Sequence, residues 1–114
     1  MDYQVEVSAI IPTLNEQETI GVCIQKVRQV FEKYGIRGEI IVSDSSKDQT
    51  PEVACTLAAI VVKPDRRGGY GYAYRFAFKY AKGKHIVSLY NVRFAINEKN
   101  PAIFFIMLTL GFYF

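Results

Sequence analysis

Tryptophan is absent from this chain, and residues that commonly bind metals through nitrogen or sulfur are scarce. Its 114 residues include two cysteines and one histidine, with no CxxC pair and no Cys/His ligand spacing. We expect Cys23 and Cys55 to be buried, reduced thiols within helices of a cytoplasmic protein. His85 falls inside a predicted strand, where a packed side chain is the simplest interpretation.

Long runs of one charge are also missing, and so is a secretory signal at the N-terminus. The start, MDYQVEV, lacks the charged and then apolar pattern of a signal peptide, so secretion is not indicated. A length of 114 residues, half of them hydrophobic, fits one domain with a packed core. The net charge of +3 suits an anionic ligand such as a nucleotide, or weak attraction to anionic lipid, and does not predict nucleic-acid binding.

The first elements are predicted from an apolar run and the helical stripe that follows it. Val5 to Ile11 is nearly continuous in apolar residues, which indicates a strand buried on both faces. Pro12 is predicted to end that strand. Asn15 and Glu18 then form a capping box, and Gly35 stops the helix. The apolar stripe of this helix comprises Ile20, Ile24, Val27 and Phe31.

Three further strands and two further helices alternate along the chain. The predicted strands are 39–42, 59–62 and 84–89; the helices are 51–57, capped by Thr50, and 72–82, with Ala73, Phe76, Ala77 and Tyr80 on one face. Such alternation with short connections predicts an α/β fold with an open, mostly parallel sheet and flanking helices. Ligands of these sheets bind at the carboxyl ends of the strands, which here are polar or rich in glycine.

Those strand ends carry the candidate binding residues. Asp44 is placed to accept a hydrogen bond from a base, with Glu16 across the adjacent strand end, while turn formation is the competing interpretation of Asp44. The loop from Arg66 to Gly69 can approach a diphosphate, or it is an ordinary surface loop. A dinucleotide fold is disfavoured because Gly69-Tyr70-Gly71 follows the third strand and not the first. A P-loop motif is absent.

Three segments together resemble family 2 glycosyltransferases with the GT-A fold. They are VSAIIPTLNEQETI at 7–20, EIIVSDSSKDQTPEVA at 39–54 and RGGYGYAYRFAFKYAKGKHIV at 67–87. The chain is most similar to the dolichyl-phosphate mannose or glucose synthase branch, over its Rossmann-like N-terminal half. The resemblance implies transfer of a hexose from a UDP- or GDP-linked sugar to a polyprenyl phosphate. By the same resemblance, the nucleotide-sugar site comprises Pro12, Leu14, Glu16, Val42, Asp44, Arg67 and Gly69.

The resemblance also implies Mg²⁺ or Mn²⁺, but the metal ligands are not found in this chain. Where the family has an Asp-x-Asp motif, residues 90–92 are Tyr-Asn-Val, and no aspartate follows Asp65. The family commonly has two acidic residues where Ser43 and Asp44 stand. We expect a nucleotide-sugar-binding half over 1–89 and an apolar tail over 90–114 that departs from the family pattern. The catalytic residues are therefore left unassigned, and no metal ligand is predicted.

We interpret the chain as a truncated or frame-disrupted glycosyltransferase, with little turnover expected from these residues alone. The 13 uncharged residues 102–114 are fewer than the ~20 that span a bilayer as a helix. The alternatives are a non-catalytic nucleotide-binding remnant or interaction module, and, less favoured, an NAD-binding fold. The expected location is cytoplasmic, with association at the cytoplasmic face of a membrane.

Overall fold

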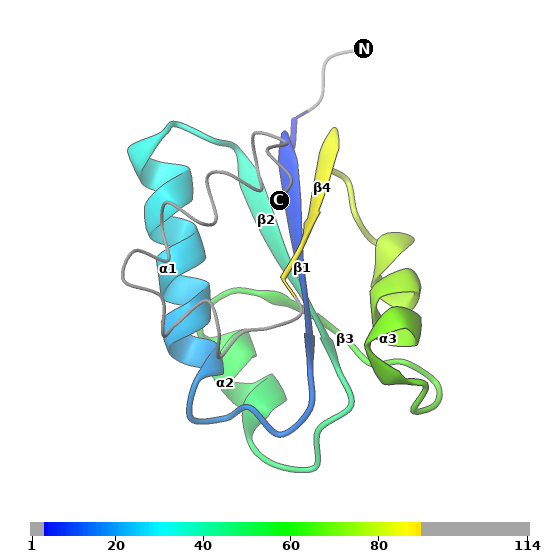
Figure 1. Cartoon of the computed structure of the whole chain (residues 1–114). Helices are drawn as coiled ribbons and strands as arrows, with labels where there is room; N and C mark the ends of the chain where they lie inside the picture. Colours follow the sequence, from blue (N-terminus) through cyan, green and yellow to red (C-terminus); the bar gives the residue numbers. More distant parts are fainter. Residues whose placement is uncertain (1–3, 90–114) are drawn as a thin grey trace.

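Four parallel strands form one sheet at the centre of the computed structural model, which describes residues 4–89 (Figure 1). The order across the sheet is β3-β2-β1-β4. The elements are β1 (Val7–Thr13), α1 (Ile20–Lys33), β2 (Gly38–Asp44), α2 (Thr50–Thr56), β3 (Ile60–Val62), α3 (Gly69–Phe78) and β4 (His85–Ser88). The predicted parallel α/β fold is confirmed; the proposed tail, 90–114, lies outside the described residues.

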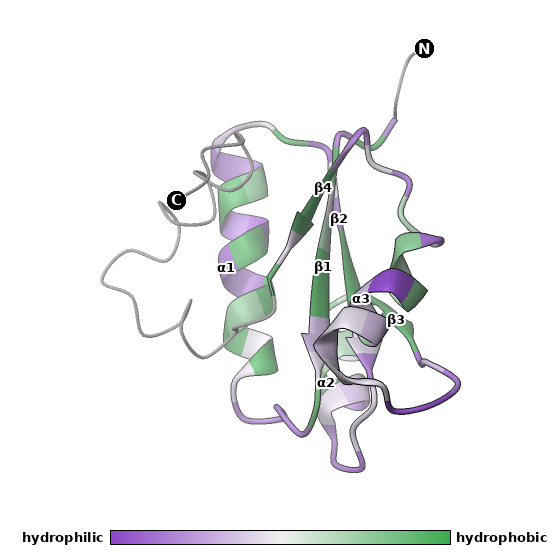
Figure 2. Cartoon of the chain, turned by 45° about the vertical axis from the view of Figure 1, so that its right-hand side comes forward, coloured by the Kyte–Doolittle hydropathy of each residue, from purple (hydrophilic) through white to green (hydrophobic). Residues whose placement is uncertain are grey.

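The helices cover both faces of the sheet, with α1 and α2 on one face and α3 on the other (Figure 1). Successive residues of a strand point to opposite faces, so β1 supplies both layers. Val7, Ala9 and Ile11 belong to the core cluster under α1 and α2. Ile10 belongs to the second cluster, which includes Ala77 of α3. Figure 2 shows the hydrophobic colouring concentrated along the strands of the sheet.

Pro12 does not end β1, as the sequence had indicated, but lies inside it. The strand continues to Thr13 and pairs with β2 over its whole length, from Val7↔Gly38 to Thr13↔Asp44. The carbonyl of Ile10 accepts a bond from Leu89, so Ile10 faces β4, and Pro12, two residues on, faces the same side. Pairing with β4 reaches only Ile10↔Ser88, so the missing N–H of Pro12 falls beyond the paired residues.

The stripe of α1 is confirmed, but its start was predicted wrongly. Ile20, Ile24, Val27 and Phe31 are all buried. Gly35 has φ of 61°, donates to Glu32, and precedes Ile36, which donates to Phe31, so the helix ends in a Schellman motif. The helix begins at Ile20 with Thr19 at the N-cap. Asn15 lies upstream with φ of 55° and therefore does not cap it.

The other helices and three side chains, those of Cys55, Tyr80 and His85, also differ from expectation. The N-cap of α2 is Gln49 rather than Thr50, and α3 begins at Gly69, three residues before the predicted start. Ala73 and Ala77 are buried as predicted, whereas Tyr80 is 44% exposed. His85 and Cys55 are exposed, while Cys23 is buried. Within residues 4–89, no helix has both the length and the apolar character needed to cross a membrane.

Candidate functional site

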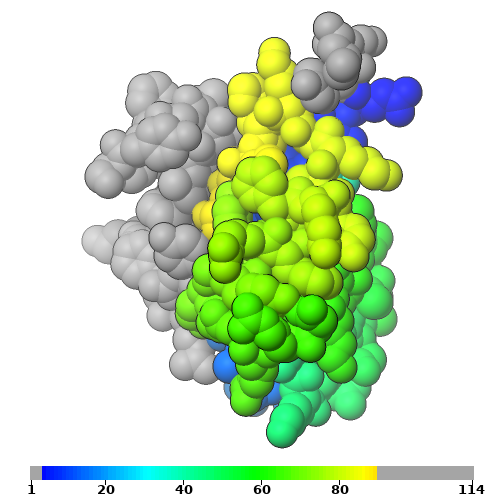
Figure 3. Space-filling model, turned by 90° about the vertical axis from the view of Figure 1, so that its right-hand side faces the viewer, coloured from blue at the N-terminus to red at the C-terminus, as the bar shows by residue number. Residues whose placement is uncertain are grey.

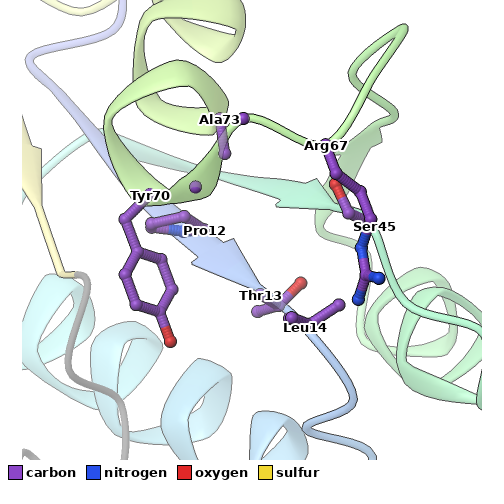
Figure 4. A pocket seen from close by; sticks show the side chains of 9 residues that line it. Pro12, Thr13, Leu14, Ser45, Arg67, Tyr70 and Ala73 are labelled. Atoms are coloured by element: carbon purple, nitrogen blue, oxygen red, sulfur yellow. The ribbon is translucent and has the colours of Figure 1, made fainter.

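A hollow lies where β1 ends and α3 begins (Figure 4). Its volume is about 160 Å³, which is smaller than the ~300 Å³ at which small-molecule pockets usually start. It therefore has room for a part of a ligand as large as a nucleotide sugar. Arg67 and Tyr70 stand on different sides of it in Figure 4. The lining residues are Pro12, Thr13, Leu14, Ser45, Arg67, Gly68, Gly69, Tyr70 and Ala73.

Asp44 is buried beside this hollow and is held by three hydrogen bonds. The hydroxyls of Thr13 and Ser46 donate to its Oδ1, at 2.7 and 2.6 Å, and the backbone N–H of Ser46 donates to its Oδ2 at 3.1 Å. The two contacts from Ser46 form a turn of the kind that aspartate commonly stabilises. An ionised carboxylate has about four acceptor sites, so Oδ2 keeps capacity for one further donor.

Ser43 joins the sheet to α3. Its side chain is fully buried and its hydroxyl donates to the carbonyl oxygen of Ala73 at 2.8 Å. An ionised aspartate at this position has no proton to donate to a carbonyl oxygen. Ser43 therefore positions the first turns of α3 over β2. The start of α3 forms one wall of the hollow, so this bond helps to set its shape.

The loops after β1 and β2 are held together by reciprocal bonds between side chains and backbone. The backbone N–H of Asn15 donates to the Ser46 hydroxyl at 2.7 Å, and its side-chain oxygen accepts from the Lys47 N–H at 3.0 Å. The Gln17 side chain accepts in the same way from Gln49, at 2.9 Å. Loop 14–19 and loop 45–49 therefore form one hydrogen-bonded unit at the carboxyl end of the sheet.

Glu16 lies in a second hollow, of about 250 Å³, lined by residues 15–19 and Asp48. Its N–H donates to the Thr50 hydroxyl at 2.9 Å, and its carboxylate accepts from Thr19 at 3.1 Å. Desolvation raises the pKa of Asp48, but hydrogen bonds from Thr50 and Gln17 outweigh it, so the pKa lies below its usual value.

The structure brings four of the seven predicted nucleotide-sugar residues together. Pro12, Leu14, Arg67 and Gly69 line the first hollow. Glu16 lines the second hollow, and Asp44 is 3% exposed between the two loops. Val42 lines neither hollow, and its side chain is fully buried in the cluster under α1 and α2. Strand alternation explains this: Ser43, the next residue, points to the α3 face.

Sequence reasoning missed Tyr70, Thr13 and Ser45 as residues of the site. Tyr70 belonged to a stretch predicted as a glycine-rich loop, but α3 begins one residue earlier, at Gly69. Thr13 was treated as part of a turn, although it ends β1 opposite Asp44. Parallel strands of equal length bring their last residues side by side. The lengths of β1 and β2 could therefore have placed Thr13 beside Asp44.

The comparison with known families identifies the family of this chain. Residues 8–89, well over half of the chain, match the family described as Glycosyl transferase family 2. The chain belongs to this family. Family 2 membership is as predicted. The narrower similarity to dolichyl-phosphate mannose or glucose synthases stays a prediction.

A curated relative shares close sequence similarity with this family 2 chain. The low-salt glycan biosynthesis hexosyltransferase Agl6 of Haloferax volcanii is 48% identical over 79 residues. These residues make up 69% of this chain and 19% of the relative. The chain therefore spans about a fifth of the length of that hexosyltransferase.

Solved structures with the same arrangement confirm the predicted GT-A fold. Mannosyl-3-phosphoglycerate synthase from Rubrobacter xylanophilus superposes with a TM-score of 0.67 at 26% identity, covering 74% of this chain and 30% of that one. Glucosyl-3-phosphoglycerate synthase from Mycobacterium tuberculosis, solved with Mn²⁺, UDP and glucosyl-3-phosphoglycerate, gives 0.64 at 28% identity, covering 75% and 33%. The chain spans about a third of each structure.

The residues that the structure describes do not fit the metal that the structural neighbour holds with UDP. Among residues 4–89, no three His, Cys, Asp or Glu side chains are grouped so that they hold a metal ion. Carboxylate oxygens are the ligands that Mg²⁺ and Mn²⁺ prefer, and the sequence has no aspartate after Asp65. Positions 90–92, where the motif is due, lie outside the described residues.

Proposed function

We propose that this chain binds the nucleotide part of a UDP- or GDP-linked sugar at the carboxyl ends of β1 and β2. Its parent activity is transfer of a hexose from that donor to a polyprenyl phosphate or a similar acceptor. Membership of family 2 carries the proposal, together with the hollow at the strand ends where such sheets bind ligands. The names of the relatives, a hexosyltransferase and two phosphoglycerate sugar synthases, support hexose transfer.

The proposed arrangement gives each part of the nucleotide a chemically suited neighbour. Pro12 and Leu14 offer apolar contact to the base or ribose, and the free acceptor site of Asp44 Oδ2 suits a ring N–H. Arg67 supplies a positive charge and five donors for the diphosphate. Gly69 has φ of 77°, and a Cβ added there would meet no atom within 4 Å, so phosphate oxygens have space near the backbone.

Catalysis by this chain alone is not expected, because the negative charge of the leaving group must be neutralised in the parent reaction. In the family the divalent ion, Mg²⁺ or Mn²⁺, neutralises the departing diphosphate. Residues 4–89 do not fit that ion, so no transfer step is assigned to them. A non-catalytic nucleotide-binding chain is therefore the second candidate, and the poor fit to the metal favours it.

Calorimetric titration of the chain with UDP and with GDP, with and without Mn²⁺, tests the proposal. We expect weak binding that Mn²⁺ barely changes. Arg67→Gln should weaken binding about tenfold or more, as loss of a charge-assisted hydrogen bond predicts. Arg66→Gln is the matched control, because the Arg66 guanidinium lies 4.2 Å from the Tyr72 ring and outside the hollow's lining.

Two outcomes of these measurements would contradict the proposal. Equal losses for Arg66→Gln and Arg67→Gln would show that only general charge attracts the nucleotide. Binding of NAD without UDP or GDP would point to a nicotinamide site instead. Transfer is tested separately with UDP-glucose or GDP-mannose, Mn²⁺ and a polyprenyl phosphate; robust turnover would show that the chain does hold a catalytic metal.

A further inference from the structure

Helix α3 buries its small side chains, whereas its large aromatic side chains are only partly buried, such as Tyr74 and Phe76, or exposed, such as Phe78. Its two buried residues are Ala73 and Ala77. Phe78 is 47% exposed, and Tyr80, just after the helix, is 44% exposed. An ordinary surface helix buries its large apolar residues and exposes polar ones. Figure 3 shows the face of the molecule on which α3 lies, turned toward the viewer.

The aromatic side chains of α3 form two rows along the helix. Tyr72, Phe76 and Tyr80 make one row, with ring centroids 6.4 and 5.9 Å apart. Tyr74 and Phe78 make the other, at 5.6 Å in an edge-on arrangement. Residues four apart lie above one another on a helix, which is why the rows follow its axis. Within each row the rings contact one another, and the two rows flank the outer side of the helix.

Cations run between and beside these rows. Arg75 and Lys79, also four apart, are both exposed and lie between the two rows by helical spacing. Lys79 Nζ is 4.2 Å from the Phe76 ring centroid, a cation–π contact. The segment 63–84 holds seven lysines and arginines and one aspartate, a net charge of +6 in a chain whose total is +3. That aspartate, Asp65, accepts a hydrogen bond from the Tyr72 hydroxyl.

We propose that this surface, the α3 aromatic–basic face (Arg75, Phe76, Phe78, Lys79 and Tyr80), docks on the anionic headgroup layer of a membrane. Tyrosine and phenylalanine suit the boundary between headgroups and acyl chains. Lysine and arginine keep their charges among anionic headgroups while their stems lie along apolar surface. The local excess of positive charge complements such lipids and is much larger than the net charge of the whole chain.

Single-stranded nucleic acid fits the same face less well. Stacking of bases needs free ring faces. Here the guanidinium of Arg66 lies over Tyr72 and the ammonium of Lys79 lies over Phe76, each at 4.2 Å from the ring centroid. The proposal is independent of the nucleotide site, because it concerns the outer side of α3 and needs no sugar donor.

The absence of tryptophan allows a direct test with a single fluorescent reporter. Phe78→Trp places an indole within the α3 aromatic–basic face. Tyr34→Trp is the matched control at the end of α1, where the native ring is 50% exposed and Lys33 Nζ lies 5.6 Å from its centroid. Phosphatidylcholine vesicles with phosphatidylserine should shift the Phe78→Trp emission to the blue, with quenching by brominated lipid. The Tyr34→Trp spectrum should not change.

Charge-neutral variants supply the second arm of the experiment. Arg75→Gln with Lys79→Gln should weaken vesicle binding about 25-fold, from about fivefold for each cation near an anionic surface. Lys26→Gln with Lys33→Gln removes two exposed cations from α1 and should leave most of the binding intact. Added salt should weaken binding of the wild-type chain.

Several results would overturn the proposal. One is an unchanged Phe78→Trp spectrum on anionic vesicles; another is an equal shift of both reporters. Tight binding of a single-stranded oligonucleotide without vesicle binding would identify a nucleic-acid surface. Self-association that is lost in Phe78→Ser would identify a contact between copies. All arms are measured without nucleotide, so failure here leaves the nucleotide titration informative, and the reverse also holds.

Discussion

Replacing Thr13 with valine removes one hydroxyl from the link between β1 and β2 while keeping the shape of the side chain. The Thr13 hydroxyl donates to Asp44 Oδ1 at 2.7 Å, across the last residue pair of the parallel ladder. Both residues are 3% exposed, so water does not readily replace the lost donor. The substitution therefore tests how much the orientation of the buried carboxylate contributes to stability.

The expected loss follows from the charge and burial of the acceptor. A hydrogen bond to a charged group contributes about 1.5–3 kcal/mol, against about 1 kcal/mol for a neutral pair. Ser46 still donates twice to Asp44, so the carboxylate is not left without partners. We expect a loss of about 2 kcal/mol, which lowers the ratio of folded to unfolded chain about 30-fold.

Urea unfolding followed by circular dichroism measures this loss, with the free energy extrapolated to water. Thr56→Val is the matched control: the Thr56 hydroxyl donates to the Val53 carbonyl at 2.7 Å, but on an exposed helical surface. That change should cost less than about 0.5 kcal/mol. The reasoning fails if Thr13→Val loses no more than Thr56→Val, or if its m-value changes, since a changed m-value would indicate altered compactness.

Three further predictions concern other parts of the molecule. Gly83→Ala should destabilise the chain by about 1–3 kcal/mol in thermal unfolding, because an added Cβ would lie 2.5 Å from the Ser8 backbone nitrogen; an unchanged Tm would contradict this. Burial raises the pKa of Cys23 to about 12, so maleimide at pH 8 should modify exposed Cys55 and spare Cys23 until urea is added, as mass spectrometry will show. Although desolvation raises the pKa of Asp48, hydrogen bonds lower it further, so its stabilisation is present above pH ~4 and is lost on acidification. The difference in urea midpoint between Asp48→Asn and the wild type should therefore be larger at pH 7 than at pH 3; an equal gap at both would refute this.

Local patterns were sufficient to predict the elements that are buried continuously. The apolar run of β1 and the stripe of α1 are periodic signals, and Gly35 adopts the left-handed conformation that its place after a helix requires. Asn15 shows where local reasoning fails. Its spacing to Glu18 favoured a cap, but its side chain bonds to Lys47, 32 residues away. A contact of that range is decided by the sheet, which brings the two loops together.

The position of the candidate site was predictable from the sequence, but the set of residues that belong to it was less predictable. Strand ends of a parallel sheet are adjacent, so Pro12, Leu14 and the loop with Arg67 were correctly expected to meet. The side of the sheet on which each residue lies depends on strand register, and one residue of difference moves a side chain to the other face. That is why Val42 is buried under α1 and α2 while Ser43 contacts α3.

The central position of β1 has a consequence for how the chain is made. Its partner β2 follows closely in sequence, but its other partner, β4, arrives about 75 residues later, as the bond from Gly83 to Ser8 illustrates. Contacts of such separation form slowly. During synthesis one edge of β1 therefore remains open until the ribosome has released the residues up to Ser88. A shorter nascent chain presents an unpaired edge of a buried, apolar strand, the kind of surface that chaperones bind.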